Sequence, residues 1–182
     1  MVPPARPTGG LSHPIKLGPV PEPSIEQKTW SHISADEFFD IAMLRTVVFY
    51  LEQQIDEPEL DERDRDESTL HVWMRDDRGV VSYLRVIEDE HPDPAHGGAR
   101  RLIGRVVTRA DARGRGLALR LVEQVIAQFG DEPLALHAQS YIQPLYTRAG
   151  FEPIGDEYVE AGIPHVTMVR PPSGRTGDAA LN

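Results

Sequence analysis

The sequence contains no cysteine, and this absence excludes several kinds of chemistry at once. A disulfide framework, a thiolate metal site and a cysteine-bound intermediate all need that side chain. The histidines do not follow a His-x-x-x-His or similar ligand spacing, so the sequence predicts no metal site. Any group transfer by this chain would therefore pass directly from donor to acceptor.

Long apolar runs and an excess of positive charge are also missing. No run approaches the ~20 apolar residues of a membrane span, and the Pro-rich N-terminus lacks the apolar core of a secretory signal. We therefore expect a cytoplasmic protein with no membrane partner. The 19 Lys and Arg against 29 Asp and Glu give a formal charge of -10. Because phosphate affinity needs clustered positive charge, we expect no nucleic-acid partner, and any anion site must be local.

The length and composition predict a single domain with two tails. The 182 residues, 40% of them hydrophobic, suffice for one core and are too few for two ordinary domains. Residues 1–24 are rich in Pro and Gly without sustained periodicity, which is typical of a flexible arm. Residues 171–182 have a similar composition and are predicted to be a flexible tail. The folded domain is therefore expected to span residues 25–170.

The first part of this domain predicts a strand, a helix and a polar loop. Residues 27–33 favour a strand, and Ser34 with Glu37 forms a capping-box signature that starts a helix. Residues 56–67 carry eight acids and two arginines, a balance of 2 - 8 = -6, which is too polar for a core element and predicts an exposed loop or turn. The apolar residues that recur at helical spacing, and that we expect to form the core stripe of the helix, are Phe38, Ile41, Leu44, Val48 and Leu51.

The rest of the domain alternates strand and helix patterns. Residues 70–75 and 80–88 flank Asp76-Asp77-Arg78-Gly79, which indicates a β-hairpin. The order of strands and amphipathic helices predicts a mixed α/β sheet with helices packed on it. The later segments are a strand at 102–108, a helix at 116–129, a strand at 134–138, a helix at 141–149, and strands at 151–157 and 166–170.

The strand at 102–108 leads into Arg113-Gly114-Arg115-Gly116-Leu117-Ala118, which begins a helix. Glycines let the backbone approach a ligand closely, and a helix N-terminus presents unpaired N–H groups to an anion. Residues 100–120 contain seven arginines and one acid, a local balance of 7 - 1 = +6. The alternative is a Gly-rich connection beside a solvated basic face. The motif lacks the ending of a P-loop and the glycine pattern of a dinucleotide fold.

Two blocks resemble the acyl-CoA motifs of the GNAT superfamily. Val106-Val107-Thr108 followed by Arg113-x-x-Gly116-x-Ala118 looks like its acyl-CoA signature, and Leu145-Tyr146-Thr147-Arg148-Ala149-Gly150-Phe151 looks like its downstream Tyr-x-x-x-Gly-Phe block. The resemblance covers roughly residues 41–170. Two further segments resemble the ElaA-like branch more specifically, namely Leu44-Arg45-x-x-Val48-Phe49-x-x-Glu52-Gln53 and Gly162-Ile163-Pro164-His165.

The resemblance implies a splayed mixed sheet flanked by helices, with acetyl-CoA between the strands that end near Thr108 and Ala138. It also implies that backbone groups of Val106, Val107 and Thr108 bind the pantetheine arm and polarise the thioester carbonyl. Thr108 departs from the apolar residue usual in the family, which backbone contacts should tolerate. The residues expected to wrap the pyrophosphate are Arg113, Gly114, Arg115, Gly116, Leu117 and Ala118.

The resemblance makes Tyr146 the candidate general acid, which would give a proton to the departing sulfur. A phenol with an unperturbed pKa of ~10 stays protonated at neutral pH. The alternative is a helix residue that only packs on the sheet. The base is left open between Glu52 and His137, acting directly or through water. Glu52 could instead cap its helix or pair with Arg45, and His137 could be a hydrogen-bonded core histidine.

The acceptor is expected to contact Arg45, Gln53, Gln139 and His165, although Gln139 could equally be a surface amide and His165 a turn residue. The resulting hypothesis is an N-acetyltransferase that moves the acetyl group of acetyl-CoA to a primary amine of a small molecule or peptide, without a metal. Two alternatives are an acyl-homoserine lactone synthase-like enzyme and a CoA-binding sensor without turnover. A homodimer is possible, and the sequence does not identify the acceptor.

Overall fold

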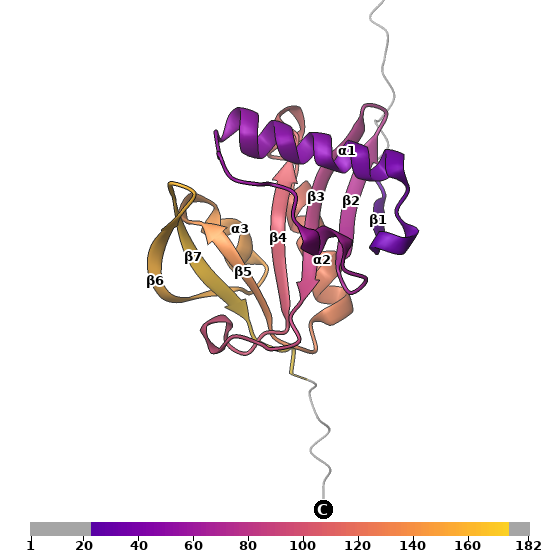
Figure 1. Ribbon diagram of the computed structural model, residues 1–182. Coiled ribbons are helices and arrows are strands. Elements are labelled where there is room, and N and C mark those ends of the chain that lie inside the picture. The colour runs from indigo at the N-terminus through magenta and orange to yellow at the C-terminus, as the bar shows by residue number, and fades with distance from the viewer. Residues whose placement is uncertain (1–22, 175–182) are drawn as a thin grey trace, which may run out of the picture.

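The computed structural model describes residues 23–174, and Figure 1 shows the arrangement of their elements. Most of the predicted arm, residues 1–24, and of the predicted tail, residues 171–182, lies outside the described part. The strands are β1 (Ile25–Lys28), β2 (Leu70–Asp76), β3 (Gly79–Glu88), β4 (Arg101–Thr108), β5 (Leu134–Gln139), β6 (Glu152–Glu160) and β7 (Ile163–Arg170). The helices are α1 (Ala35–Thr46), α2 (Leu117–Phe129) and α3 (Gln143–Arg148), with a π-helix η2 (Val47–Glu52) and the short turns η1 (Trp30–His32), η3 (Glu62–Arg65), η4 (Pro94–His96), η5 (Ala110–Ala112) and η6 (Ser140–Ile142).

The strands form one seven-stranded mixed sheet in the order β1-β2-β3-β4-β5-β7-β6. All neighbours are antiparallel except β4 and β5, which run parallel. These two strands pair at three positions only, where Arg101–Ile103 face Leu134–Leu136. Beyond that point they separate, and Figure 1 shows the gap between the β1–β4 half and the β5–β7 half. The predicted splayed α/β sheet is confirmed.

A β-bulge in β4 lies just beyond the last of these pairs. Tyr83 of β3 faces Val107, whereas Arg85 faces Gly104, so a single residue of β3 spans both Arg105 and Val106. Arg105 takes a positive φ of 53°. A bulge bends its strand and leaves the extra residue outside the ladder. The bend therefore begins where β4 leaves β5.

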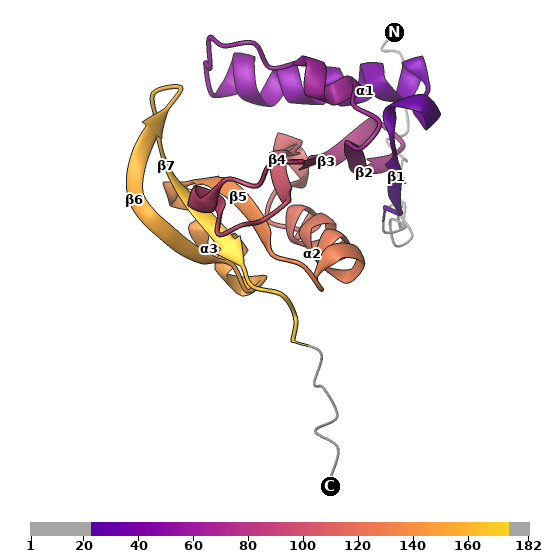
Figure 2. The same cartoon turned by 60° about the horizontal axis from the view of Figure 1, so that its bottom comes forward.

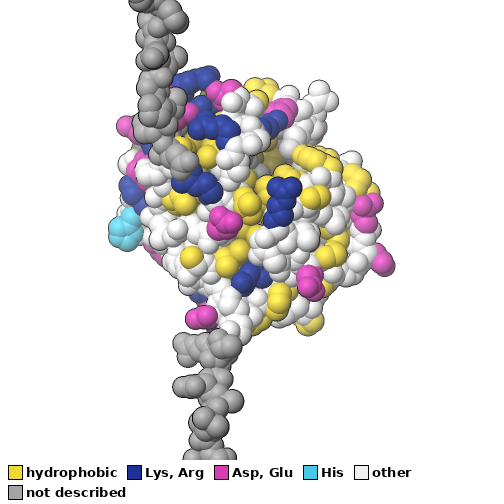
Figure 3. Space-filling view, turned by 180° about the vertical axis from the view of Figure 1, so that it is seen from behind, with side chains coloured by type: hydrophobic (Ala, Val, Ile, Leu, Met, Phe, Trp, Pro, Cys, Tyr) yellow, Lys and Arg dark blue, Asp and Glu magenta, His cyan; other side chains and the backbone are white. Residues whose placement is uncertain are grey.

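Helix α1 covers one face of the sheet, and α2 and α3 cover the other (Figure 2). The second face holds the larger core, in which Leu121, Val122 and Val125 of α2 are buried against the strands. On that side the surface intersperses acidic, basic and hydrophobic side chains (Figure 3). The smaller core lies under α1 and includes Ile41, Trp73, Tyr83 and Val107 among its buried residues.

The predicted capping box at the start of α1 is present. Ser34 Oγ accepts from the Glu37 N–H at 3.2 Å, and the Glu37 carboxylate accepts from the Ser34 N–H at 2.8 Å. The predicted core stripe is right for Ile41, Leu44 and Val48, which are buried, but wrong for Leu51, whose side chain is 64% exposed. The π-helix η2 adds residues to each turn, so the 3.6-residue spacing no longer points Leu51 at the sheet.

Most predicted elements are confirmed to within a few residues, and the first strand is the clearest exception. The hairpin has the predicted turn, with Asp76 paired to Gly79. Residues 27–33 are not one strand, because β1 pairs with β2 only as far as Lys28. The chain then makes the turn η1, since it has to leave the sheet edge to reach the face where α1 packs.

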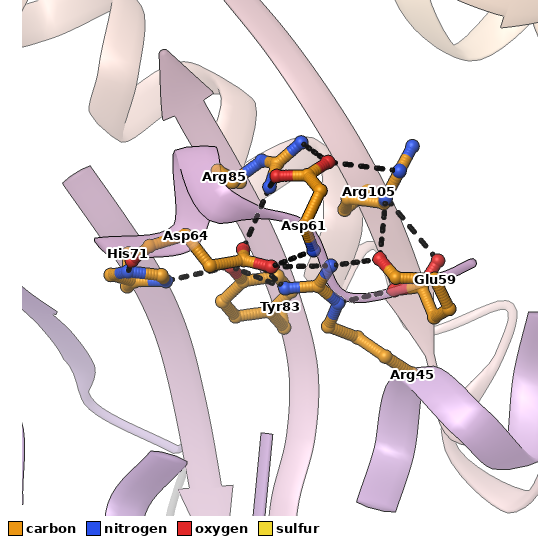
Figure 4. A network of polar contacts seen from close by, with 8 residues as sticks. All are labelled: Arg45, Glu59, Asp61, Asp64, His71, Tyr83, Arg85 and Arg105. Carbon is orange, nitrogen blue, oxygen red and sulfur yellow. Dashed lines mark hydrogen bonds and ion pairs between the residues drawn. The ribbon is translucent and has the colours of Figure 1, made fainter. Parts of the chain in front are cut away.

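The acidic segment 56–67 is a loop with the turn η3, but the expectation that it is wholly exposed is wrong. Asp64 is 1% exposed and Arg45 is fully buried. Asp64 Oδ1 accepts from Arg45 Nη1 at 2.7 Å and from Arg85 Nη1 at 2.8 Å (Figure 4). A buried charge is tolerated when it is paired and hydrogen-bonded, and here arginines from α1 and β3 provide both.

Three acids and three arginines balance one another in this network. Glu59 pairs with Arg45 and Arg105, Asp61 pairs with Arg85 and Arg105, and the buried ring of His71 bonds to the Tyr83 hydroxyl at 2.8 Å (Figure 4). The network therefore ties α1, the acidic loop, β3 and the bulge of β4 together.

Candidate active site

A cavity of about 670 Å³ occupies the space where β4 and β5 separate. Its walls come from the ends of both strands, the start of α2, the helix α3, the end of η2 and the β6–β7 hairpin. Cavities of several hundred cubic ångströms with a few convergent polar groups are typical ligand sites. The residues of the two sequence blocks meet in this cavity.

The turn before α2 is built to let a ligand approach its backbone. Gly114 and Gly116 have φ values of 74° and 75°, a conformation that favours glycine. A Cβ at either position would meet no atom within 4 Å, so the space in front of both residues is open. Gly116 caps α2, and no side chain accepts a hydrogen bond from the first turn of that helix. The free N–H groups suit an anion such as a pyrophosphate.

The arginines near this turn contribute less positive charge than the sequence suggests. Five of the seven in residues 100–120 form ion pairs with acids outside that range; the five are Arg100, Arg101, Arg105, Arg109 and Arg113. The local balance of +6 is therefore largely neutralised. Arg113, Gly114, Gly116, Leu117 and Ala118 line the cavity as expected, whereas Arg115 does not. The glycine backbone is the stronger feature of the anion site.

Replacing Gly116 with valine is expected to weaken acetyl-CoA binding by at least about tenfold, because one lost hydrogen bond to a charged group is worth about 1.5–3 kcal/mol. The new side chain would enter the open space in front of the turn. Gly98→Val is the matched control, since Gly98 has a φ of 74°, equally open surroundings and no place in the cavity wall. Calorimetry with acetyl-CoA measures both variants. Equal affinities would contradict a ligand at Gly116.

Val106, Val107 and Thr108 at the end of β4 all line the cavity. The Thr108 hydroxyl lies 2.9 Å from Ser82 Oγ, and Ser82 Oγ also donates to the Val107 carbonyl at 3.0 Å. Ser82 of the neighbouring strand β3 therefore bonds to the unusual threonine, and the Thr108 hydroxyl is not an unpaired group of the cavity wall.

The end of η2 reaches both sides of the cavity. Glu52 accepts two hydrogen bonds from Arg113, at 2.5 and 2.7 Å. The hydrogen bonds from Arg113 lower the pKa of Glu52, so this carboxylate is a weak base in this position. Gln53 Oε1 accepts from Gln139 Nε2 at 3.1 Å. The two predicted acceptor-binding glutamines are thus brought together across the splayed strands.

Arg45 lies elsewhere. Its guanidinium is fully buried in the network of Figure 4, donates to the Glu59 carbonyl at 2.6 Å, and does not line the cavity. This position does not fit the expected contact between Arg45 and the acceptor. Arg45, Glu52 and Gln53 belong to one sequence motif, but the side chain of Arg45 points away from the cavity that Glu52 and Gln53 line.

Tyr146 lies in α3, is 4% exposed and lines the cavity. Its ring meets Phe151 edge-on, with centroids 6.2 Å apart. No residue in the described part of the chain makes a hydrogen bond with its hydroxyl. The hydroxyl oxygen is not fully buried. Loss of hydration, aided by Tyr141, raises the pKa of Tyr146. The phenol therefore stays protonated and has a proton to donate to a ligand.

Three histidines and a tyrosine, contributed by β5, β6, β7 and η4, lie together at one end of the cavity. His137 Nδ1 bonds to the Tyr158 hydroxyl, and the His137 ring meets the edge of His96 with centroids 5.0 Å apart. Partial loss of hydration, with the neighbouring His96 and His165, lowers the pKa of His137 although Glu160 opposes the shift. His165 Nδ1 lies 2.8 Å from the Ile163 carbonyl oxygen.

Several residues of the cavity wall and of the histidine cluster beside it were not predicted from the sequence. Tyr158 reaches the cluster only because β6 pairs with β7 and places it opposite His165. Glu160, Arg85 and Arg105 line the cavity itself, whereas Tyr158 does not. The basic stretch did include Arg105, but no local motif marks Tyr158 or Glu160, because their relevance depends on strand pairing.

The comparisons with known proteins agree with this geometry. Residues 36–170 match the family model described as an acetyltransferase (GNAT) domain. The UPF0039 protein Rv2851c of Mycobacterium tuberculosis is 38% identical over 153 residues, which cover 82% of this chain and 94% of that protein. Escherichia coli ElaA is 29% identical over 147 residues, covering 77% and 91% of the two chains.

Solved structures give the same answer. An acyl-CoA N-acyltransferase from Pseudomonas aeruginosa superposes with a TM-score of 0.71 at 32% identity, covering 81% of this chain and 99% of that one. The crystal structure of Escherichia coli ElaA gives a TM-score of 0.72 at 25% identity with the same coverage. The chain belongs to the GNAT acetyltransferase family. Within it the chain is an acyltransferase that resembles ElaA.

Two further observations concern residues 23–174 alone. No helix there is long and apolar enough to cross a membrane. No group of three or more His, Asp or Glu side chains in the same part is placed to hold a metal ion.

Proposed function

We propose that the protein moves an acetyl group from acetyl-CoA directly to a primary amine of a small molecule or peptide. The observation that carries this proposal is the cavity between β4 and β5, which has an open glycine turn at one wall and the Tyr146 hydroxyl, without a partner among the described residues, at another. Acyl-CoA-dependent transfer is the activity of the family, whereas the acetyl group and the amine are the finer part of the proposal.

The donor half of the cavity is formed by β4 and the start of α2. Backbone groups of Val106, Val107 and Thr108 would orient the pantetheine arm. The turn from Arg113 to Ala118 would bind the pyrophosphate through backbone N–H groups, which a helix N-terminus leaves available. When bound, acetyl-CoA supplies the thioester carbonyl that the amine attacks.

Proton transfer requires a donor and an acceptor on the protein. Tyr146 would donate to the departing sulfur, since its raised pKa keeps the phenol protonated. For the base, the geometry favours His137 over Glu52. Arg113 binds both oxygens of Glu52, whereas His137 is neutral at neutral pH because its pKa is lowered, and it lines the cavity.

A thiol-release assay with acetyl-CoA and a panel of primary amines tests the proposed function. The chain has no cysteine, so a thiol reagent reports released CoA without a protein background. We expect release that depends on the amine, together with a mass increase of one acetyl group on the acceptor. Calorimetry that detects no acetyl-CoA binding would contradict the proposal at its first step.

Other outcomes separate the alternatives. Tight acetyl-CoA binding without thiol release from any amine would indicate a CoA-binding module. Thiol release only with S-adenosylmethionine would indicate an acyl-homoserine lactone synthase-like activity. Gln53, Gln139 and His165 remain the predicted acceptor contacts. A cytoplasmic location, a homodimer and the lack of a nucleic-acid partner also stay predictions.

A further inference from the structure

The cavity joins the two faces of the sheet. Leu136 and Ala138 of β5 pack into the core beside α2 and α3, so His137 between them points to the opposite face. The same alternation on β7 places Val166 in that core and His165 on the opposite face. Tyr146, by contrast, is buried in the core beside α2 and α3. The proton donor and the histidines therefore approach the cavity from opposite faces.

Most charged side chains of the cavity wall are paired within the protein, and the two exceptions lie on different sides of the cavity. Arg113 is paired with Glu52, and Arg85 and Arg105 are paired within the network of Figure 4. Glu160 and Arg148 line the cavity, and their side chains form no hydrogen bond or ion pair with any residue in the described range. Arg148 belongs to α3, on the Tyr146 side. Glu160 ends β6 opposite Ile163, two positions along the same strands from the Tyr158–His165 pair.

His165 is fixed in one tautomer. The Ile163 carbonyl can only accept, so His165 Nδ1, at 2.8 Å, carries the proton and Nε2 has the lone pair. Nε2 makes no hydrogen bond with any of residues 23–174. It is not fully buried, in contrast to Trp73 Nε1 and His96 Nδ1, the two fully buried atoms in that range that lack a partner. Since His165 lines the cavity, the lone pair is available there. The ring is held by stacking on Tyr158, with centroids 6.0 Å apart and planes 24° apart.

We propose that this end of the cavity is an alkylammonium site in which Glu160 holds the acceptor and His165 Nε2 takes its proton. The inference rests on the proposed acetyl transfer and names the chemical class of its acceptor, an amine basic enough to be protonated in water. It assigns proton removal to His165 in place of His137. A lone carboxylate complements one ammonium group, and the adjacent fixed lone pair can receive its proton.

The reaction then balances in protons and bonds. His165 Nε2 takes one proton from the ammonium and passes it to solvent, which frees the lone pair of the amine. Attack forms the C–N bond and breaks the C–S bond of the thioester. The remaining excess proton on nitrogen goes to Nε2, while the sulfur receives the Tyr146 proton. Water returns one proton from the His165 imidazolium to the Tyr146 oxygen.

Binding can be tested without turnover. The full chain is saturated with CoA, which has no acyl group to transfer, and titrated with n-butylammonium while the histidine ring signals are followed by NMR. We expect the His165 signals to move, and Glu160→Gln to weaken this binding by about tenfold, the usual effect of losing one charged hydrogen bond. Glu152→Gln is the control, because Glu152 lies at the other end of β6, outside the cavity wall.

Each result has one meaning. Failure of CoA itself to bind would remove the proposed function. Normal CoA binding with unmoved His165 signals, or an unchanged affinity in Glu160→Gln, would overturn the alkylammonium site and leave the proposed function standing.

Kinetics with n-butylamine and acetyl-CoA test the role of His165. His165→Gln is expected to lower kcat by about 10²–10³-fold with an unchanged KM for acetyl-CoA, a typical effect of removing a general base. Added imidazole should restore part of the rate, because it can take the proton in place of the missing ring. His137, Tyr158, Glu160 and His96 also face this site, so His137→Gln is measured in parallel.

The control for both histidine variants is His91→Gln, since His91 is exposed and outside the cavity. If His165→Gln keeps the native kcat while His137→Gln loses it, the assignment to His165 is wrong.

Discussion

Replacing Asp64 with alanine is expected to lower the free energy of unfolding by about 3–5 kcal/mol, the usual cost of removing one partner of a buried ion pair. The variant would leave Arg45 and Arg85 buried with one negative charge fewer between them. Urea unfolding followed by circular dichroism measures the change. Asp66→Ala is the control, because Asp66 is an exposed acid two residues along the same loop. A loss no larger than in Asp66→Ala would contradict the structural role of the network.

Lowering the pH should reduce the stabilisation that Asp64 provides. Loss of hydration tends to raise the pKa of Asp64, but the hydrogen bonds and charges of Arg45 and Arg85 outweigh it, so the pKa is lowered. The stabilisation by Asp64 is therefore present above the unfolded pKa of ~3.9 and is lost as the pH falls through the folded value. Glu59 shifts the other way, because loss of hydration raises its pKa. Comparing Asp64→Asn with the native protein across pH isolates the Asp64 part.

Replacing Tyr146 with phenylalanine is expected to lower kcat by about 10²–10⁴-fold, the range for a lost general acid. The KM for acetyl-CoA should change little, because the ring can keep its packing against Phe151. Steady-state thiol release with an amine found in the screen measures both constants. The cavity wall is otherwise the same, since only the hydroxyl is removed.

Tyr50→Phe is the matched control for this variant. Tyr50 is 56% exposed on η2 and does not line the cavity, so the loss of its hydroxyl should leave kcat unchanged. An unaltered kcat in Tyr146→Phe would reject the assigned role. A rise in KM with a constant kcat would show instead that the hydroxyl only binds the donor.

The sequence predicted those parts of the fold that depend on local patterns. The Ser34 and Glu37 capping box, the turn at Asp76 to Gly79 and the glycines before α2 each act within a few residues, and the structure contains all three. Leu51 was misplaced because a π-helix changes the period without any Gly or Pro to mark the change.

The missed parts of the site depend on residues far apart in the chain. Asp64 looked exposed because its neighbours are acidic, yet its partners Arg45 and Arg85 lie 19 and 21 positions away. Glu160 joins the cavity wall, and Tyr158 joins the histidines beside it, only through the pairing of β6 with β7. Local composition cannot reveal such partners, because the free energy of a buried charge is set by tertiary contacts.

The short pairing between β4 and β5 also bears on aggregation. Past Ile103 and Leu136 the two strands no longer bond to each other, which gives the sheet an edge in its interior. At the periphery of a protein, such an edge is a template for strands of other molecules. Here it lies inside a cavity bounded by α2, α3 and η2, where a slender ligand can reach it and a neighbouring sheet cannot.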